Sequence, residues 1–307
     1  MTDITHPILV TGAHRSGTTW VGKMLAADAD TAYISEPLNV LHRPGVFRAK
    51  VSRWYQYICE ENEKDFLPAY EELIDFDYHL LDEIRSIRSR KDFLRMGRDF
   101  LIFYNGSLRG QRALIKDPFA VFSTPWFAQK LNCKVIITVR HPGAFASSLK
   151  RLNWNFDFKD LLDQPLLIRD RVSAYQDEMK SIKADDVIGQ ASLLWKIIYR
   201  SVHSTLSLNP DFIVVRHEDL SRDPAGGFRD LYAKLGLDYT PKVEKTILNS
   251  SSSENPVELS RKKVHSVKLD SRANMDNWKK RLTEEEIKRI RQMTEDVSSL
   301  FYPDGEW

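Results

Sequence analysis

The first part of the chain alternates short apolar runs with amphipathic segments. Ile8-Leu9-Val10 is an apolar run that ends at Gly12, which is typical of a buried parallel strand. From Thr18 to about Ala27, the apolar positions cluster on one side of a predicted helix. A second short strand is predicted at Ala32-Tyr33-Ile34. Strand, helix and strand in this order are typical of proteins with parallel sheets.

The same alternation returns in the second half of the chain. Strands are predicted at residues 113–115, 135–139 and 212–215, and helices at 143–152, 190–207 and 283–301. Thr283 and Glu286 form a capping-box signature at the start of the last helix. Because strands that alternate with helices pair in parallel, we predict one α/β domain over residues 1–307. Its central parallel sheet should have about five strands, with helices on both faces.

Residues from about 42 to 110 interrupt this alternation, and we interpret them as a helical insertion. Large side chains recur there at helical spacing: Phe66, Tyr70, Leu73, Leu80, Leu81, Ile84, Phe93, Phe100, Leu101 and Tyr104. We expect the aromatic residues of the insertion to pack in the core rather than to contact a ligand.

Composition places the chain among ordinary globular proteins, with 42% hydrophobic and 29% charged residues. Its 45 basic and 43 acidic residues leave a formal charge of +2, which provides no general field for nucleic acid. Any anion binding therefore depends on locally placed groups. Cys59 and Cys133 are interpreted as free thiols of a reducing compartment. Without a leader-like segment or a run of about 18 apolar residues, we expect a soluble, cytoplasmic protein with no membrane span.

The segment between the first strand and the first helix has the layout of an anion-binding loop. Residues 10–20 read VTGAHRSGTTW, in which Gly12 and Gly17 have the spacing of a Walker A loop. A strand, a glycine-bounded turn and a helix start direct backbone N–H groups and the helix dipole at an anion. We therefore expect a phosphate site at this turn.

The loop differs from a Walker A sequence in the position of its cation. Thr18 occupies the place of the Walker lysine, and the cation is Arg15, inside the loop. A kinase or ATPase uses that lysine on the β/γ-phosphates and the next hydroxyl on Mg²⁺. One guanidinium with the hydroxyls of Thr18 and Thr19 suits a phosphate or phosphosulfate held without metal, and we expect no metal ion. His14, His141 and His217 do not have the spacing of metal ligands, and we interpret them as loop residues.

A second basic position follows the predicted strand at 135–139. Arg140 directly follows that strand, and Ser148 lies two turns into the next helix. Both can converge on one phosphate at the sheet edge where open α/β sheets bind ligands. The alternative is that Arg140 is a solvated strand-end charge.

The string Arg-Ser-Gly-Thr-Thr-Trp at residues 15–20, together with Arg140 and Ser148, resembles the bacterial-type PAPS-dependent sulfotransferases, which have a P-loop-like fold. The resemblance implies sulfuryl transfer from 3′-phosphoadenosine 5′-phosphosulfate (PAPS) to an acceptor hydroxyl by in-line displacement, releasing 3′-phosphoadenosine 5′-phosphate (PAP). It implies that Arg15 assists the leaving phosphate and that Arg140 and Ser148 hold the 3′-phosphate. The implied 5′-phosphosulfate contacts are Ser16, Gly17, Thr18 and Thr19. Trp20 is either an adenine contact or a core residue.

Near the C-terminus, Ser271-Arg272 followed by Trp278-Lys279-Lys280 resembles the nucleotide-binding loop of the same family, although the glycines of its cytosolic branch are absent. The resemblance implies that Arg272 contacts the 3′-phosphate. A solvated basic loop is the alternative, and other basic residues nearby are Lys262, Lys263 and Lys268.

The catalytic base is expected to be a carboxylate. The cytosolic branch of the family uses a histidine shortly after a lysine, and the corresponding segment here, Ile115-Lys116-Asp117-Pro118, has none. Glu36 is the first candidate and Asp117 the second. Glu36 has the alternative role of a loop carboxylate paired with Arg15 or Lys116. Lys116 is expected either to contact the transferring sulfuryl group or to form a structural ion pair.

The acceptor is expected to be an alcohol on a small molecule, a glycan or a lipid, bound on the side of the insertion. The aromatic residues there favour an apolar or aromatic acceptor. An acidic or phosphorylated acceptor would instead suit the basic run Arg85, Arg88, Arg90, Lys91, Arg95 and Arg98. Two other functions stay open: a nucleotide-dependent small-molecule kinase and a non-catalytic nucleotide-binding protein on the same fold.

Overall fold

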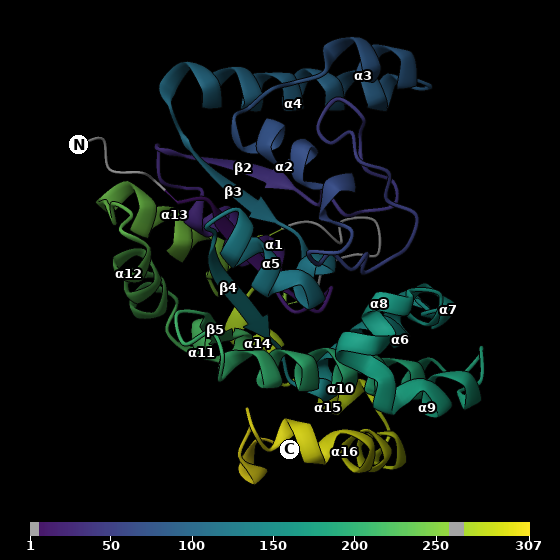
Figure 1. Ribbon diagram of the computed structural model, residues 1–307. Helices are drawn as coiled ribbons and strands as arrows, with labels where there is room; N and C mark the ends of the chain where they lie inside the picture. The colour runs from purple at the N-terminus through teal and green to yellow at the C-terminus, as the bar shows by residue number, and fades with distance from the viewer. Residues whose placement is uncertain (1–5, 258–266) are drawn as a thin grey trace.

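Five parallel strands form the central sheet of the computed structural model, which describes residues 6–257 and 267–307 (Figure 1). The strands are β1 (Ile8–Gly12), β2 (Thr31–Ser35), β3 (Arg112–Lys116), β4 (Lys134–Val139) and β5 (Ile213–Arg216). Their order across the sheet is β2-β3-β1-β4-β5, and Ile8 pairs with Leu114 on one side and Lys134 on the other. The predicted α/β fold with a parallel sheet of about five strands is confirmed.

The strands supply two hydrophobic cores, one on each face of the sheet. Leu9, Ile115 and Ile137 belong to the larger cluster, whereas Ile8 and Leu114 belong to the smaller one. Successive side chains of a strand point to opposite faces. A strand that is covered on both faces is therefore apolar at most positions, which is why the sequence shows short continuous apolar runs.

Helices cover both faces (Figure 1). The smaller core is closed by α1 (Thr18–Leu25), α12 (Pro224–Leu235) and α13 (Pro241–Ser251). The larger core is closed by α5 (Thr124–Lys130), α6 (Pro142–Leu152) and α10 (Val187–Leu206), with α16 (Glu284–Ser298) packed on α6 and α10. Helix α16 begins with the predicted capping box of Thr283 and Glu286.

Shorter helices connect these elements. They are α7 (Lys159–Leu162), α8 (Pro165–Leu167), α9 (Gln176–Ser181), α11 (His217–Arg222), α14 (Ser271–Asn274) and α15 (Asn277–Arg281). Because α6 directly follows β4 and α11 directly follows β5, both helices begin at the carboxyl edge of the sheet, where α1 also begins. Ligands bind at this edge in open α/β sheets.

The segment from 42 to 110 forms α-helices only in its second part. These are α2 (Leu67–Ile74), α3 (Leu80–Ser86) and α4 (Arg90–Arg109), whereas turns and irregular chain dominate residues 36–62. Phe66 and Tyr70 are buried as predicted. The prediction of core packing is wrong for Phe93, Phe100 and Tyr104, which are exposed on α4 together with several leucines. Helix α4 packs on β2 through its opposite side, so helical spacing alone did not define which side is covered.

Candidate active site

The loop predicted to bind phosphate, residues 12–17, joins β1 to α1, and we call it the phosphate loop. Close packing requires both of its glycines. Gly12 has a φ of 138°, and a Cβ there would lie 2.3 Å from the carbonyl oxygen of Thr138. Gly17 has a φ of 100°, and a Cβ there would lie 2.5 Å from the ring of His217. Any other residue would be strained and would push the loop away from β4 or α11. The glycine spacing in the sequence therefore reflects how closely the loop approaches its neighbours.

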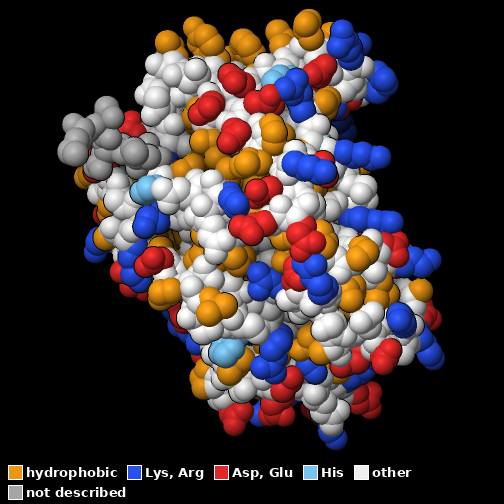
Figure 2. Space-filling view, viewed as in Figure 1, with side chains coloured by type: hydrophobic (Ala, Val, Ile, Leu, Met, Phe, Trp, Pro, Cys, Tyr) orange, Lys and Arg blue, Asp and Glu red, His pale blue; other side chains and the backbone are white. Residues whose placement is uncertain are grey.

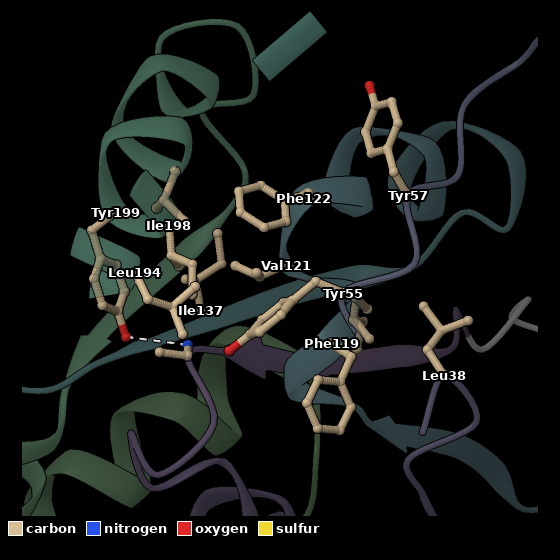
Figure 3. Close-up of a cluster of buried hydrophobic side chains, with 14 of the residues drawn as sticks. Leu38, Tyr55, Tyr57, Phe119, Val121, Phe122, Ile137, Leu194, Ile198 and Tyr199 are labelled. Atoms are coloured by element: carbon tan, nitrogen blue, oxygen red, sulfur yellow. Dashed lines mark hydrogen bonds between the residues drawn. The ribbon is translucent and has the colours of Figure 1, made fainter. Parts of the chain in front are cut away.

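Two buried tyrosines hold the backbone of this loop (Figure 3). The Tyr199 hydroxyl accepts a hydrogen bond from the N–H of Ala13 at 3.3 Å and donates to the carbonyl of Thr138 at 2.9 Å. The Tyr55 hydroxyl accepts from the N–H of His14 at 3.3 Å. Burial raises the pKa of both phenols, so they remain neutral. These hydrogen bonds hold the loop in its conformation.

A first cavity lies at the N-terminus of α1. Seven of the residues predicted from the sequence line it: Arg15, Gly17, Thr18, Thr19, Trp20, Arg140 and Ser148. Nε of Arg15 donates to the Ser148 hydroxyl at 3.2 Å, and Arg140 donates to the carbonyl of Arg15 at 3.0 Å. The two predicted anion sites are therefore in direct contact, although they are far apart in the sequence.

Four arginines line the first cavity, because Arg151 and Arg281 join Arg15 and Arg140. Burial, together with Arg140 and Arg151, lowers the pKa of Arg15 to about 10. Burial also lowers the pKa of Arg140. All four groups are cations at neutral pH, and such closely placed, partly desolvated cations favour a bound anion. The N-terminus of α1 adds its dipole to this field.

Sequence reasoning missed Arg151 and Arg281. Arg151 lies one helical turn after Ser148 on α6, so the spacing on a predicted helix was a signal for it. Arg281 directly follows Trp278-Lys279-Lys280, but the sequence does not distinguish it from the other basic residues of that run.

Ser16 and Trp20, two of the residues predicted to contact PAPS, also have structural roles. The Ser16 hydroxyl donates to the carbonyl of Ala13 at 2.6 Å and contacts the Thr138 hydroxyl at 2.6 Å, so it is used within the loop. Trp20 belongs to the smaller core and donates from Nε1 to the Ser250 hydroxyl at 2.9 Å, while it also lines the first cavity.

The C-terminal segment reaches the first cavity through neighbours of the predicted arginine. Ser271 and Asn274 line the cavity, whereas the guanidinium of Arg272 donates to the carbonyl of Arg222. Lys268 is exposed, and its neighbours in the sequence, Val267 and Leu269, line the cavity. Lys262 and Lys263 lie outside the residues that the structure describes.

A second cavity, of about 490 Å³, meets the first at Arg15, Thr18 and Thr19. Its aromatic lining residues are Trp54, Tyr55, Phe119, Trp154 and Phe156. This volume is typical of a small-molecule site. Trp154 and Phe156 belong to the irregular segment between α6 and α7, which carries no periodic signal, and the sequence analysis missed them.

Glu36 lines the second cavity immediately after β2. One carboxylate oxygen pairs with Nζ of the buried Lys116, and the other accepts from Nδ2 of Asn39 at 2.8 Å. The residue has a φ of 55°, a left-handed conformation that costs energy for a non-glycine residue and is common at functional sites. Glu36 thus forms the ion pair that was one of its two predicted roles, and it also lines the second cavity, whereas its role as the base stays a prediction.

Asp117 lies behind Glu36 and is fully buried. Its two oxygens accept from the N–H of Leu38 at 2.6 Å and from that of Phe119 at 2.9 Å, and burial raises its pKa to about 7. Neither Asp117 nor Lys116 is among the described residues that line the two cavities. The bond to Leu38 holds the turn that carries Glu36.

Replacing Asp117 with asparagine is expected to lower the free energy of unfolding by about 1–3 kcal/mol, because the new NH₂ group would face one of the two N–H donors. Urea unfolding measures this loss. Asp211→Asn, at an exposed position, is the matched control and should leave the midpoint unchanged. If both variants unfold at the wild-type urea concentration, Asp117 does not hold the turn.

His14, which sequence reasoning treated as a loop residue, lines the second cavity. Its Nδ1 lies 2.6 Å from the Tyr55 hydroxyl. Burial, and then the charge of Arg15, lower its pKa to about 4, so the imidazole is neutral at physiological pH. Its position between Gly12 and Gly17 was the signal that could have identified it. Within residues 6–257 and 267–307, no group of three or more His, Cys, Asp or Glu is placed to hold a metal ion.

Several solved sulfotransferase structures are similar to this chain at low sequence identity. Among solved structures, the sulfotransferase domain from the curacin biosynthetic pathway has 16% sequence identity and a TM-score of 0.50, over 98% of this chain and 99% of that one. Sulfotransferase STF9 from Mycobacterium avium has 13% identity and a TM-score of 0.48, over 98% and 78%. Mouse sulfotransferase SULT7A1, complexed with PAP, has 14% identity and a TM-score of 0.45, over 98% and 87%.

No curated protein matches the sequence of this chain significantly. Residues 7–241, however, match the sulfotransferase family. That match covers most of the chain and includes the phosphate loop, all five strands, Arg140 and Ser148. This protein therefore belongs to the sulfotransferase family.

Proposed function

We propose that the protein transfers the sulfuryl group of PAPS to a hydroxyl of an acceptor molecule and releases PAP. The observation that carries this proposal is the convergence of four arginines on the first cavity, beside a glycine-bounded loop and a helix N-terminus. In a chain with a net charge of only +2, this concentration of positive charge favours a ligand with several anionic groups. PAPS carries such groups at two separate positions.

The two ends of the donor have different partners in this proposal. The 5′-phosphosulfate binds the phosphate loop through Arg15, Thr18 and Thr19, together with backbone N–H groups at the start of α1. The 3′-phosphate binds Arg140 and Ser148. Arg151 and Arg281 line the same cavity and add positive charge. Guanidinium and hydroxyl groups are the donors that phosphate oxygens prefer.

The acceptor occupies the second cavity. Its aromatic walls suit an alcohol with an apolar or aromatic body, and Asp157 and Asp160 also line the cavity. These carboxylates disfavour an anionic acceptor. The basic residues of α3 and α4 do not contribute to it, because none of them is among the described lining residues.

The junction of the two cavities suits in-line displacement. The acceptor oxygen forms a bond to sulfur from the second cavity, while the bond from sulfur to the bridging phosphate oxygen breaks on the side of the first. Glu36 receives the proton of the acceptor hydroxyl. Arg15, which lines both cavities, neutralises the charge that develops on the leaving phosphate. Lys116 holds Glu36 in place through their ion pair.

Calorimetric titration with PAP in the absence of Mg²⁺ tests the donor assignment. We expect binding, and we expect Arg140→Ala to weaken it about ten- to a hundredfold, because the variant removes a charged hydrogen-bond donor. Arg229→Ala is the matched control, since that arginine is exposed and pairs with Glu244 away from the cavity. Equal affinity of the wild type and Arg140→Ala would contradict the assignment.

A parallel titration with ATP and Mg²⁺ separates the competing functions. Tight ATP binding without any response to PAP would reject the sulfotransferase proposal in favour of a nucleotide-dependent kinase. Binding of PAP without sulfuryl transfer to any alcohol of a broad panel would favour a non-catalytic nucleotide-binding protein.

A further inference from the structure

Helices α3 and α4 expose nine large apolar side chains to solvent. We call this set the apolar face; it comprises Leu80, Leu81, Ile84, Phe93, Leu94, Phe100, Leu101, Tyr104 and Leu108. Leu94 is 73% exposed, Leu108 69% and Phe93 60%. Figure 2 shows hydrophobic side chains along the upper edge of the molecule, where Figure 1 places α4. A water-soluble monomer rarely exposes so many large apolar side chains on two neighbouring helices without using them.

The apolar face follows the helical repeat of α4. Phe93, Phe100 and Tyr104 are seven and four residues apart, and Leu94, Leu101 and Leu108 follow at intervals of seven, so all six lie on one side. The opposite side of α4 packs against the protein through Asp99, Phe103 and Gly106. A surface helix is normally polar on the side that faces water. Here that side carries large apolar residues, which indicates that the exposed side of α4 contacts a partner.

Basic residues surround the apolar face. Those exposed on or beside α3 and α4 are Arg85, Arg88, Arg90, Lys91, Arg95, Arg98 and Arg109, and we call them the basic rim. The acidic residues of these two helices are all paired: Asp82 with Arg85, Glu83 and Asp92 with Arg43, and Asp99 with Arg98. Within the part of the chain that is described, Arg88, Arg90, Lys91, Arg95 and Arg109 form no ion pair. These five residues of the rim therefore carry positive charge that no carboxylate of the described residues neutralises.

We propose that α3 and α4 dock the protein on the surface of an anionic lipid bilayer, with the apolar face among the acyl chains and the basic rim at the headgroups. Helices with an apolar side and flanking arginines and lysines bind membranes in this orientation. The contact is interfacial, and among the described residues no helix is long and apolar enough to cross a bilayer. The proposal does not depend on the donor or the acceptor of the reaction.

The charges favour a membrane over a second copy of the chain. A symmetric dimer brings the same patch of two subunits together, so the two basic rims would approach and repel each other. A bilayer that contains phosphatidylserine instead neutralises the rim, and each arginine or lysine near its surface strengthens binding about fivefold. Both parts of the patch then have a complementary environment.

Co-sedimentation of the full-length protein with lipid vesicles tests this proposal. We expect binding to vesicles of phosphatidylcholine with phosphatidylserine, weaker binding to phosphatidylcholine alone, and release at high salt. The double variant Leu94→Glu/Leu101→Glu should bind at least about tenfold more weakly, because both leucines leave the acyl region. Leu208→Glu is the matched control, since Leu208 is 82% exposed but lies outside the apolar face.

Three outcomes would overturn the proposal. In the first, the protein stays in solution with both kinds of vesicle. In the second, the double variant binds vesicles as tightly as the wild type and as the control Leu208→Glu. In the third outcome, light scattering shows a dimer that the double variant converts to a monomer without any vesicle binding by the wild type, which assigns the face to self-association. PAP affinity, measured on each variant, should match the wild type and shows that the fold and the first cavity are intact.

Discussion

Replacing Arg15 with alanine is expected to lower kcat about 100- to 1,000-fold. Arg15 lines both cavities and is half-buried beside Arg140 and Ser148, so its charge acts on the leaving phosphate oxygen in a partly desolvated site. The affinity for PAPS should fall less than kcat, because the charge on the leaving oxygen develops only as the bond to sulfur breaks. The measurement is PAP release from PAPS with the most active alcohol of a panel of phenols and long-chain alcohols.

Arg15→Lys is the informative companion to this variant. It keeps the charge but loses the planar guanidinium that reaches Ser148, so we expect an intermediate kcat. The exposed Arg229→Ala again serves as the control. If Arg15→Ala turns over at the wild-type rate, Arg15 does not act on the leaving group, although its place at the junction of the cavities stands.

The second large effect is expected at Glu36. Glu36→Gln should lower kcat about 100- to 10,000-fold while PAP affinity stays unchanged, because glutamine has nearly the same shape but cannot accept the proton of the acceptor hydroxyl. The same PAP-release assay and the calorimetric titration measure the two quantities. An unchanged PAP affinity separates the loss of a base from a general loss of structure.

His14 provides the test against another base in the second cavity. Its half-buried imidazole is neutral, is hydrogen-bonded to Tyr55 and lines the cavity, so it is a rival to Glu36 for the acceptor proton. We expect His14→Gln to retain most of the activity. The assignment of the base moves to His14 if His14→Gln is inactive and Glu36→Gln is active.

The sequence by itself determined the sheet and the phosphate loop, because both depend on local patterns. Strands that are buried on both faces are apolar at most positions, and this made β1, β3 and β4 recognisable from short apolar runs. The less completely buried strands β2 and β5 were recognisable from short apolar runs of the same kind. Gly12 and Gly17 were recognisable because the close contacts of the loop exclude any side chain there. Arg15 and Arg140 stood next to these local signals, directly in the loop and at the strand end.

Only the tertiary structure decided which residues from separate segments share a cavity. Arg281, Trp154 and Phe156 come from a short helix and an irregular segment whose positions are set by long-range packing, so no local pattern marks them. The same packing places Glu36 at the second cavity and Asp117 behind it, although both follow strands in the sequence.

The exposure of α3 and α4 was also decided only in three dimensions. Their apolar spacing predicted helices correctly, but periodicity shows which residues share a side and not what covers that side. Because α4 uses its opposite side to pack on β2, the side with Phe93, Phe100 and Tyr104 remains at the surface. A residue becomes core only when another element of the fold covers it, and that depends on contacts between segments distant in the chain.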